Sequence, residues 1–320
     1  MRIAFCWMTF VFISSTTLAQ GNFPNKPVRM VAPFPAGGSS DLVGRIIAQG
    51  LSETWGQQVI VDNRPGAGGS VGTALVARSP ADGYTILLGG LSPTAINLSL
   101  YKNPGYYTPR DLTAIVPVAS AATMLAIHPG VKANTVQELI ALARAKPGAL
   151  SCGSGGIGTP SHLICEMLKG AVKVDILHVA YKGTGQSVND LLGGQIQLVF
   201  ASMPVGYPHA QSGKVRALAV TSSTRTPLAP ELPTFPEAGV PGLVFDNWWG
   251  MFAPAGTAQP IIDKMALDMT RIVQRAEVKK RYAAMGTDTY IMSHKDFIAF
   301  SRAEVTKFAK VVKDAGLQPE

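Results

Sequence analysis

Residues 28–55 are VRMVAPFPAGGSSDLVGRIIAQGLSETW. The first seven are apolar enough for a buried strand, and the Gly-rich turn PAGGSSD follows, in which Ser39 or Ser40 can cap a helix. From Val43 to Trp55 the apolar residues recur at helical spacing, which predicts an amphipathic helix. A strand, a glycine turn and a helix in this order are typical of a βα unit with parallel strands.

The same alternation continues along most of the chain. It predicts an α/β fold with parallel-type sheets that are flanked by helices on both faces. Expected strands are 28–34, 59–61, 85–88, 124–127, 150–152, 175–179, 198–201, 217–220 and 248–254. Expected helices begin near 39 and 70 and cover 135–147, 259–274 and 296–314, and one more follows each of the strands at 150–152, 175–179 and 198–201.

A change of composition suggests how the lobes are divided. The segment 226–241 carries five prolines and little periodicity, so it is expected to be a loop-rich connection. We expect two α/β lobes with two crossings between them. Lobe 1 takes 20–123 and 249–320, and lobe 2 takes 124–248.

Composition excludes several classes of protein. The chain has 320 residues, of which 47% are hydrophobic and 15% charged, against about 25% charged in an ordinary soluble protein. This excludes a disordered chain, a coiled coil and a small disulfide scaffold. The formal net charge is +8, but the basic residues are scattered, so we expect no nucleic-acid partner.

The first nineteen residues have the pattern of a secretory signal peptide. Arg2 precedes an apolar run from Ile3 to Ile13, and Thr17 and Ala19 supply the small residues of a cleavage site. The run is too short for the ~20 apolar residues that span a bilayer. We therefore expect 1–19 to be cleaved and the mature chain to act outside the cytoplasm.

Three Gly-rich loops stand out, at 35–41, 66–72 and 153–161. The first and third each join a strand to a helix, and Thr159 and Pro160 suit the cap and first position of the later helix. Amides at a helix N-terminus favour an anion, and glycines let a ligand approach the backbone. Each loop alone is explained by a tight βα turn. Two of them, one in each lobe, favour a shared anion site in the crevice between the lobes.

Two enzyme motifs are rejected. Residues 153–158 match G-x-G-x-x-G between a strand and a helix, but export argues against a nicotinamide cofactor. Residues 68–72 match G-x-S-x-G, but no strand directly precedes Ser70, as a nucleophile elbow requires. We therefore expect no catalytic residues, no cofactor and no enzyme.

The histidines and cysteines give no metal signature. No histidine lies four residues from another, and Cys152 and Cys165 lack a zinc-site spacing, so we expect no metal site. In an exported protein these two cysteines either form a disulfide or stay as buried free thiols.

A few other side chains are candidates for the crevice. His162 is expected either near a ligand or bonded to local backbone, and Tyr181 and Lys182 follow a strand and can offer a hydroxyl and a cation. Trp248 and Trp249 either line a pocket or pack in the core.

Several motifs together resemble one family. They are FPAGG (34–38) with Asp41, NRPGAGG (63–69), the stretch 153–162, YKG (181–183), DLLGG (190–194), ALAVTS (217–222), WG (249–250) and APAGT (253–257). Over nearly the whole mature chain the sequence is similar to the Bug family of periplasmic receptors, the substrate-binding components of tripartite tricarboxylate transporters. Departures are Ala180 in place of the usual proline, Phe308 where tryptophan is common, and a less typical stretch from Leu91 to Thr94.

The resemblance implies a two-lobed, type II-like periplasmic-binding-protein fold that closes on a small carboxylate (a di- or tricarboxylate, an amino acid or an aromatic acid). It assigns residues 36–40 to one jaw of the site and residues 159–162 to the other. It also implies membrane transporter subunits as partners and a periplasmic location, and we expect a monomer. The alternatives are a secreted carboxylate sensor and, more distantly, a secreted hydrolase. Candidate ligand-binding residues are Phe34, Ala36, Gly37, Gly38, Ser39, Ser40, Asp41, Gly68, Ser92, Gly153, Thr159, Pro160, Ser161, His162, Tyr181, Lys182, Ser202 and Trp248.

Overall fold

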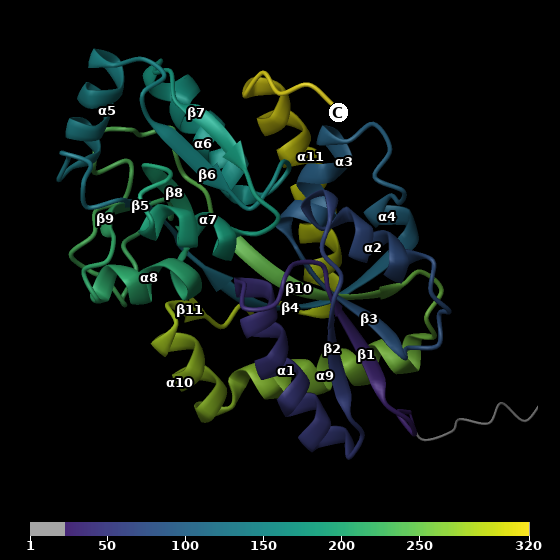
Figure 1. Cartoon of the computed structure of the whole chain (residues 1–320). Helices are drawn as coiled ribbons and strands as arrows, with labels where there is room; N and C mark the ends of the chain where they lie inside the picture. The colour runs from purple at the N-terminus through teal and green to yellow at the C-terminus, as the bar shows by residue number, and fades with distance from the viewer. Residues whose placement is uncertain (1–22, 320) are drawn as a thin grey trace, which may run out of the picture.

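The computed structural model describes residues 23–319, so the predicted signal peptide lies outside the described residues. Within this range the chain forms two α/β lobes, each built on one sheet, as Figure 1 shows. This is the predicted two-lobed architecture. No helix between residues 23 and 319 is long and apolar enough to cross a bilayer.

The sheet of the first lobe has six strands in the order β11-β4-β10-β3-β1-β2. β1 pairs in parallel with β2 and β3, whereas β10 runs antiparallel to both β3 and β4. Its strands are β1 (Val28–Ala32), β2 (Val59–Asn63), β3 (Thr85–Gly90), β4 (Leu112–Ala121), β10 (Asn247–Pro254) and β11 (Thr287–Asp288).

The sheet of the second lobe has five strands in the order β7-β6-β8-β5-β9. β6 pairs in parallel with β7 and β8, and β5 runs antiparallel to β8 and β9. Its strands are β5 (Thr123–Ile127), β6 (Ser151–Ser154), β7 (Leu177–Ala180), β8 (Leu198–Ser202) and β9 (Arg216–Val220).

The prediction of parallel-type sheets is therefore wrong in part, because both sheets are mixed. The reason lies in the two crossings. The parallel strands end at the boundary between the lobes, so a strand that enters from the other lobe starts at that boundary and runs the opposite way. β5 and β10 are these entering strands. We place the limits of the lobes at the two crossings.

Helices cover both faces of each sheet. α1 and α9 bury their apolar faces on one side of the first sheet, and α2 and α11 on the other. In Figure 1 the second lobe, with α5 to α8, lies at the upper left. The helices are α1 (Ser39–Trp55), α2 (Ser70–Ala77), α3 (Asn97–Leu100), α4 (Thr108–Asp111), α5 (Val136–Ala145), α6 (Pro160–Val172), α7 (Thr184–Leu192), α8 (Met203–Gln211), α9 (Gln259–Gln274), α10 (Ala276–Ala284) and α11 (His294–Asp314), with short helical turns η1 (Ala67–Gly69) and η2 (Ser92–Ile96).

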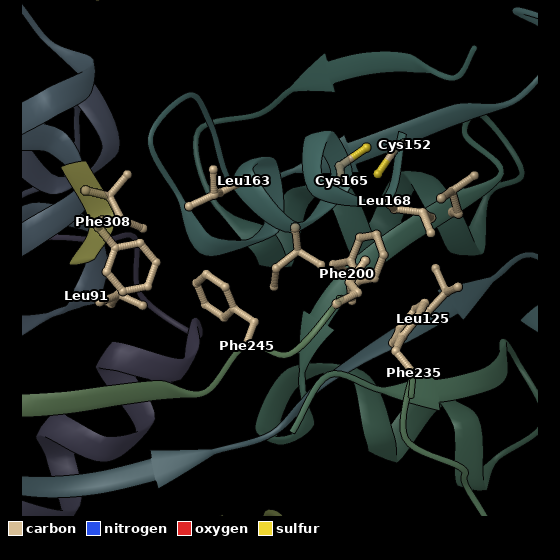
Figure 2. Close-up of a cluster of buried hydrophobic side chains, with 14 of the residues drawn as sticks. Leu91, Leu125, Cys152, Leu163, Cys165, Leu168, Phe200, Phe235, Phe245 and Phe308 are labelled. Carbon is tan, nitrogen blue, oxygen red and sulfur yellow. The ribbon is translucent and has the colours of Figure 1, made fainter. Parts of the chain in front are cut away.

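One apolar cluster continues from lobe to lobe. Phe308 of α11 packs edge to face on Phe245, with ring centroids 5.5 Å apart, and Phe200 of β8 belongs to the same cluster (Figure 2). Burial of such rings contributes about 2 kcal/mol each. The same cluster includes Cys152 and Cys165, which are buried as free thiols. Burial raises the pKa of the Cys152 thiol, which keeps it protonated.

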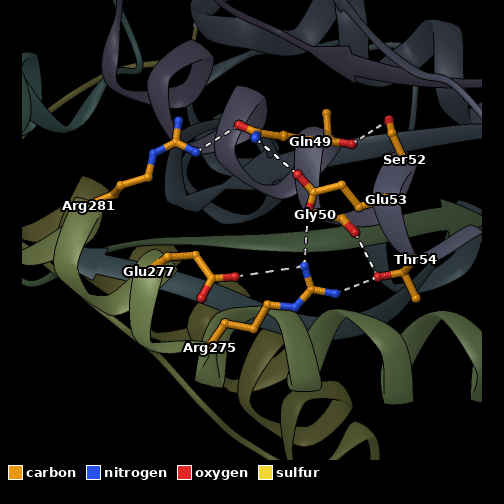
Figure 3. Close-up of polar contacts among 9 residues, drawn as sticks. Gln49, Gly50, Ser52, Glu53, Thr54, Arg275, Glu277 and Arg281 are labelled. Atoms are coloured by element: carbon orange, nitrogen blue, oxygen red, sulfur yellow. Dashed lines mark hydrogen bonds and ion pairs between the residues drawn. The ribbon is translucent and has the colours of Figure 1, made fainter.

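Polar contacts hold α10 beside α1 at the surface of the first lobe (Figure 3). The Arg275 guanidinium donates to Glu53 at 3.1 Å and to Thr54 at 2.7 Å, and Arg281 donates to Gln49 at 2.8 Å. These contacts are exposed, and exposed ion pairs contribute about 0–1 kcal/mol each. They orient α10 more than they stabilise the fold.

Candidate functional site

A cavity of about 530 Å³ lies where the parallel strands of both sheets end. This position agrees with the general rule for open α/β sheets, in which ligands bind beyond the carboxyl ends of the strands. Both lobes contribute to its wall, and Thr123 and Asn247 place the two crossings in it. The lining residues are Phe34 to Ser40, Gly90 to Pro93, Thr123, Thr159 to Ser161, Gly183 to Gln186, Val188, Asn189, Phe200, Ser202, Pro204, Val205, Pro208, His209, Asn247 and Trp249.

Four helices begin at this cavity. Their N-cap residues, Gly38 of α1, Thr159 of α6, Gly183 of α7 and Ser202 of α8, all line it. None of the four caps its helix with a side-chain hydrogen bond. By contrast, Thr135 and Ser293 do cap α5 and α11, which begin elsewhere. At each of these four helix starts, the first backbone amides therefore do not donate to the N-cap side chain. They can instead donate to a ligand in the cavity.

The cavity carries no formal charge of its own. Within residues 23–319 its lining includes no Lys, Arg, Asp or Glu, and His209 is its single ionisable side chain. Apolar rings, among them Phe34, Phe200 and Trp249, supply much of the remaining wall. An anion in this site would be held by helix dipoles, amides and hydroxyls rather than by a cation.

The loop between β1 and α1 is shaped by Gly37 and Asp41. Gly37 has a φ of +79°, which favours glycine, and its amide donates to the Asp41 carboxylate at 2.9 Å. Arg45, one turn further along α1, donates to the same carboxylate oxygen at 2.9 Å. Burial raises the pKa of Asp41, but the hydrogen bonds from Arg45 and the Gly37 amide outweigh it and lower the pKa overall. Asp41 thus stays ionised and fixes the first jaw from behind.

The loop before α6 is held by its own side chains. The Thr159 hydroxyl donates to the Gly156 carbonyl at 2.6 Å, and the Gly155 amide donates to the Ser161 hydroxyl at 2.9 Å. Gly158 has a φ of +77°, and a Cβ atom there would lie 2.3 Å from the Asn97 amide oxygen. Only glycine therefore fits at this point, where the second jaw meets the first lobe.

Direct contacts join the two lobes around the cavity. The Ser39 and Ser202 hydroxyls are hydrogen-bonded to each other across it. The Ser92 hydroxyl lies 2.6 Å from the Gly158 carbonyl and 2.7 Å from the Gly68 carbonyl, so it bridges the second and third Gly-rich loops. A Cβ atom on Gly183 would lie 3.0 Å from the Pro35 ring. The two lobes are therefore in direct contact around the cavity.

His162 lies behind the second jaw. It is buried, its Nδ1 accepts from the Gly158 amide at 3.4 Å, and its ring lies 4.4 Å from that of His178, centroid to centroid. Burial, with the neighbouring His178, lowers the pKa of His162 to about 4. The ring is therefore neutral near pH 7 and bonds to local backbone, which is one of the two alternatives that the sequence left open.

The structure brings together eleven of the predicted ligand-binding residues in the cavity lining. Both predicted jaws are represented, together with Ser92 after β3 and Ser202 at the end of β8. Their contact with a ligand stays a prediction. The eleven are Phe34, Ala36, Gly37, Gly38, Ser39, Ser40, Ser92, Thr159, Pro160, Ser161 and Ser202.

The other seven predicted ligand-binding residues do not line the cavity. Asp41 and His162 support the jaws from behind, and Gly68 is used through its carbonyl. Gly153 packs against Ile196 inside the second lobe, where a Cβ atom would lie 2.4 Å from that side chain.

The other three point elsewhere. The Tyr181 hydroxyl donates to Asp190 at 2.7 Å, and burial together with this carboxylate raises its pKa to about 12. Lys182 is exposed. Trp248 is buried on the opposite side of β10 from the cavity, and its indole donates to Glu304 at 3.0 Å.

Trp249 is the tryptophan of the site. Neighbouring residues of a strand face opposite ways, so only one of the pair can reach the cavity. The Trp249 indole donates to the Ser40 hydroxyl at 2.9 Å and so ties β10 to the start of α1. Lining residues at the start of α7 and in α8 were not among the candidates drawn from the sequence. The Gly-rich turn KGTG (182–185), which runs into α7, was an available signal.

Comparison with known proteins decides the family. The model for the tripartite tricarboxylate transporter family receptor matches residues 43–317. The chain belongs to this family. Its members are periplasmic solute receptors rather than enzymes, and the resemblance that the sequence motifs indicated is confirmed.

Individual members of the receptor family resemble this chain closely. Protein BugT of Bordetella pertussis is 35% identical over 311 residues, which cover 96% of this chain and 95% of BugT. The structure of the periplasmic binding protein BugD is 35% identical, with a TM-score of 0.89, over 93% of this chain and 100% of BugD. R. palustris Rpa4515, solved with adipate, is 33% identical, with a TM-score of 0.91, over 93% of this chain and 100% of Rpa4515.

Proposed function

We propose that this receptor binds a small carboxylate in the cavity between its lobes and delivers it to a membrane transporter. The observation that carries the proposal is the convergence of four helix N-termini, uncapped by their own N-cap side chains, on a cavity lined without formal charge. Each N-terminus carries about +0.5 of an elementary charge, and a carboxylate can accept from several amides at once. The adipate bound by Rpa4515 belongs to the same chemical class.

The wider setting follows from the family and the N-terminal sequence. We propose that residues 1–19 are a cleaved signal peptide, that the mature chain acts in the periplasm as a monomer, and that the transporter subunits are its partners. No hydroxyl in the described lining is hydrogen-bonded to an imidazole or a carboxylate that could activate it as a nucleophile, so we propose that the ligand leaves unchanged.

The test is a ligand panel with two readouts. Purified mature protein, unfolded and refolded to remove any ligand carried over, is screened against mono-, di- and tricarboxylates, amino acids and aromatic acids by thermal shift. A true ligand at 100 times its Kd is expected to stabilise the fold by about 2.7 kcal/mol. The same sample is then assayed for unchanged ligand. The proposal fails if no carboxylate shifts the melting temperature, or if the ligand is consumed.

Affinity is expected to change little with salt. Neutral donors inside a closed cavity are screened far less than exposed cations, for which the screening length is about 8 Å at physiological ionic strength. Isothermal titration of the best ligand at 20 and 300 mM NaCl is expected to give Kd values within about threefold. A tenfold or steeper loss would show that a cation outside the lining, with Lys182 the first candidate, holds the carboxylate.

A further inference from the structure

Three potential metal ligands meet behind the second jaw. His162 and Glu166 come from α6, and His178 comes from β7. One ligand atom of each residue lies within 4.8 Å of the others. His162 is buried, and the other two are partly buried. None of the three lines the ligand cavity, so the cluster is a separate feature of the second lobe.

The fold explains why these side chains meet. His162 and Glu166 are four residues apart, so they share one face of α6. β7 lies beside β6 at the edge of the sheet, and the residue that pairs with His178 is Cys152, which is in the apolar cluster under α6. The helix face and the strand edge therefore bring two imidazoles and a carboxylate to one place. Sequence spacing missed it, because the second histidine comes from another element.

We propose that His162, Glu166 and His178 form a binding site for a borderline divalent transition-metal ion such as Zn²⁺. Two imidazoles and one carboxylate are a ligand set that zinc accepts, with a further position left for water. Each imidazole has two ring nitrogens, one to bind a metal and one to be held by the protein.

The surroundings supply that second partner for His178. Its Nε2 lies 2.7 Å from the Ser154 hydroxyl, which can accept the ring proton and leave Nδ1 for the metal. Such an outer contact orients a metal-binding imidazole. In His162 the Nδ1 lone pair accepts from the Gly158 amide at 3.4 Å, a long contact that the metal would replace. Ser154 ends β6 and leads into the second jaw, so a bound metal would anchor that jaw.

A cation already pairs with the carboxylate. Lys169, one turn beyond on α6, lies 2.9 Å from Glu166. Its side chain is 25% exposed and can swing into solvent, which opens a path for an ion. A metal ion and Lys169 therefore compete for the same carboxylate. Removal of the Lys169 charge is expected to strengthen metal binding, and a variant that has merely misfolded would not bind the metal more tightly.

The experiment is a titration of the full mature protein, made without a polyhistidine tag and freed of metal by a chelator. ZnCl₂ is added by isothermal titration calorimetry. One ion is expected to bind per chain. Glu166→Gln and His178→Gln are expected to weaken zinc binding at least tenfold. Lys169→Gln is expected to tighten it at least threefold, because the competing charge is gone.

His128→Gln is the matched control. That histidine also has one nitrogen engaged, by the Gly130 amide at 3.1 Å, but it is not part of the cluster. Its zinc affinity is expected to equal that of the unchanged protein. The proposal is overturned if zinc binds no better to the unchanged chain than to His178→Gln, or if Lys169→Gln fails to strengthen binding.

Discussion

Replacing Gly38 with valine is expected to abolish carboxylate binding while the protein still folds. Gly38 is the N-cap of α1 and lines the cavity. Its φ of −80° and ψ of 170° lie in the extended region, which β-branched residues adopt readily. A Cβ atom would lie 3.3 Å from the Pro35 carbonyl oxygen, a contact that a small shift relieves. The valine methyls would then occupy the space beside the first amides of α1.

The expected loss is at least about 100-fold in Kd, equivalent to about 2.7 kcal/mol. It is measured by isothermal titration with the best ligand of the panel, alongside the melting temperature of the free protein. Gly242→Val is the matched control, because a Cβ atom there meets nothing within 4 Å and the residue lies outside the cavity. Unchanged affinity in a folded Gly38→Val variant would remove the start of α1 from the site.

Short-range sequence patterns were sufficient to predict helices whose apolar spacing or capping residue is unambiguous. The helix at 259–274 was predicted over the residues that α9 occupies, because its apolar positions recur without interruption and Pro260 suits the first turn. The helix expected from Thr135 likewise begins there, and the Thr135 hydroxyl caps it by accepting from the Glu138 amide at 3.1 Å.

β4 was missed for a physical reason. Pro117 lies in its middle, and proline inside a run normally argues against a strand. In the structure the pairing of β4 with β10 shifts register beside Pro117, and this bulge accommodates the ring. Because β4 and β10 are central neighbours, missing one also hid the antiparallel half of the first sheet.

The site was predictable where it is made of backbone. Glycine loops before helices mark amides that a ligand can reach, so the sequence could predict that the loops at 35–41 and 153–161 meet at one cavity. The sequence could not show which way a side chain points. From the sequence, Trp248 and Trp249 are equal candidates for the cavity wall, and only the register of β10 shows that Trp249 lines it. His162 directly follows three lining residues, yet its side chain faces the protein interior.

The protein is expected to lose stability in mild acid because of His162. Four groups in this corner determine its titration: His178 on β7, and His162 itself with Glu166 and Lys169 on α6. Burial, His178 and Lys169 lower the pKa of His162, Glu166 opposes them, and the result is a pKa of about 4. In the unfolded chain the pKa is about 6.5. As the pH falls below 6.5, His162 is protonated in the unfolded chain but stays neutral in the folded chain. The stabilisation is therefore complete above pH 6.5 and is lost progressively down to pH 4.

This difference in pKa corresponds to about 3 kcal/mol, of which about 2 kcal/mol is lost between pH 6.5 and 5. Urea unfolding at these two pH values, with a chelator present to remove metal, is expected to show that loss in the unchanged protein. In His162→Gln the loss is expected to be smaller by about 2 kcal/mol, because glutamine does not titrate. The His128→Gln variant corrects for histidine removal as such and is expected to follow the unchanged protein. Parallel losses in all three would mean that His162 already takes up its proton in the folded state, and that its burial beside His178 does not keep the ring neutral.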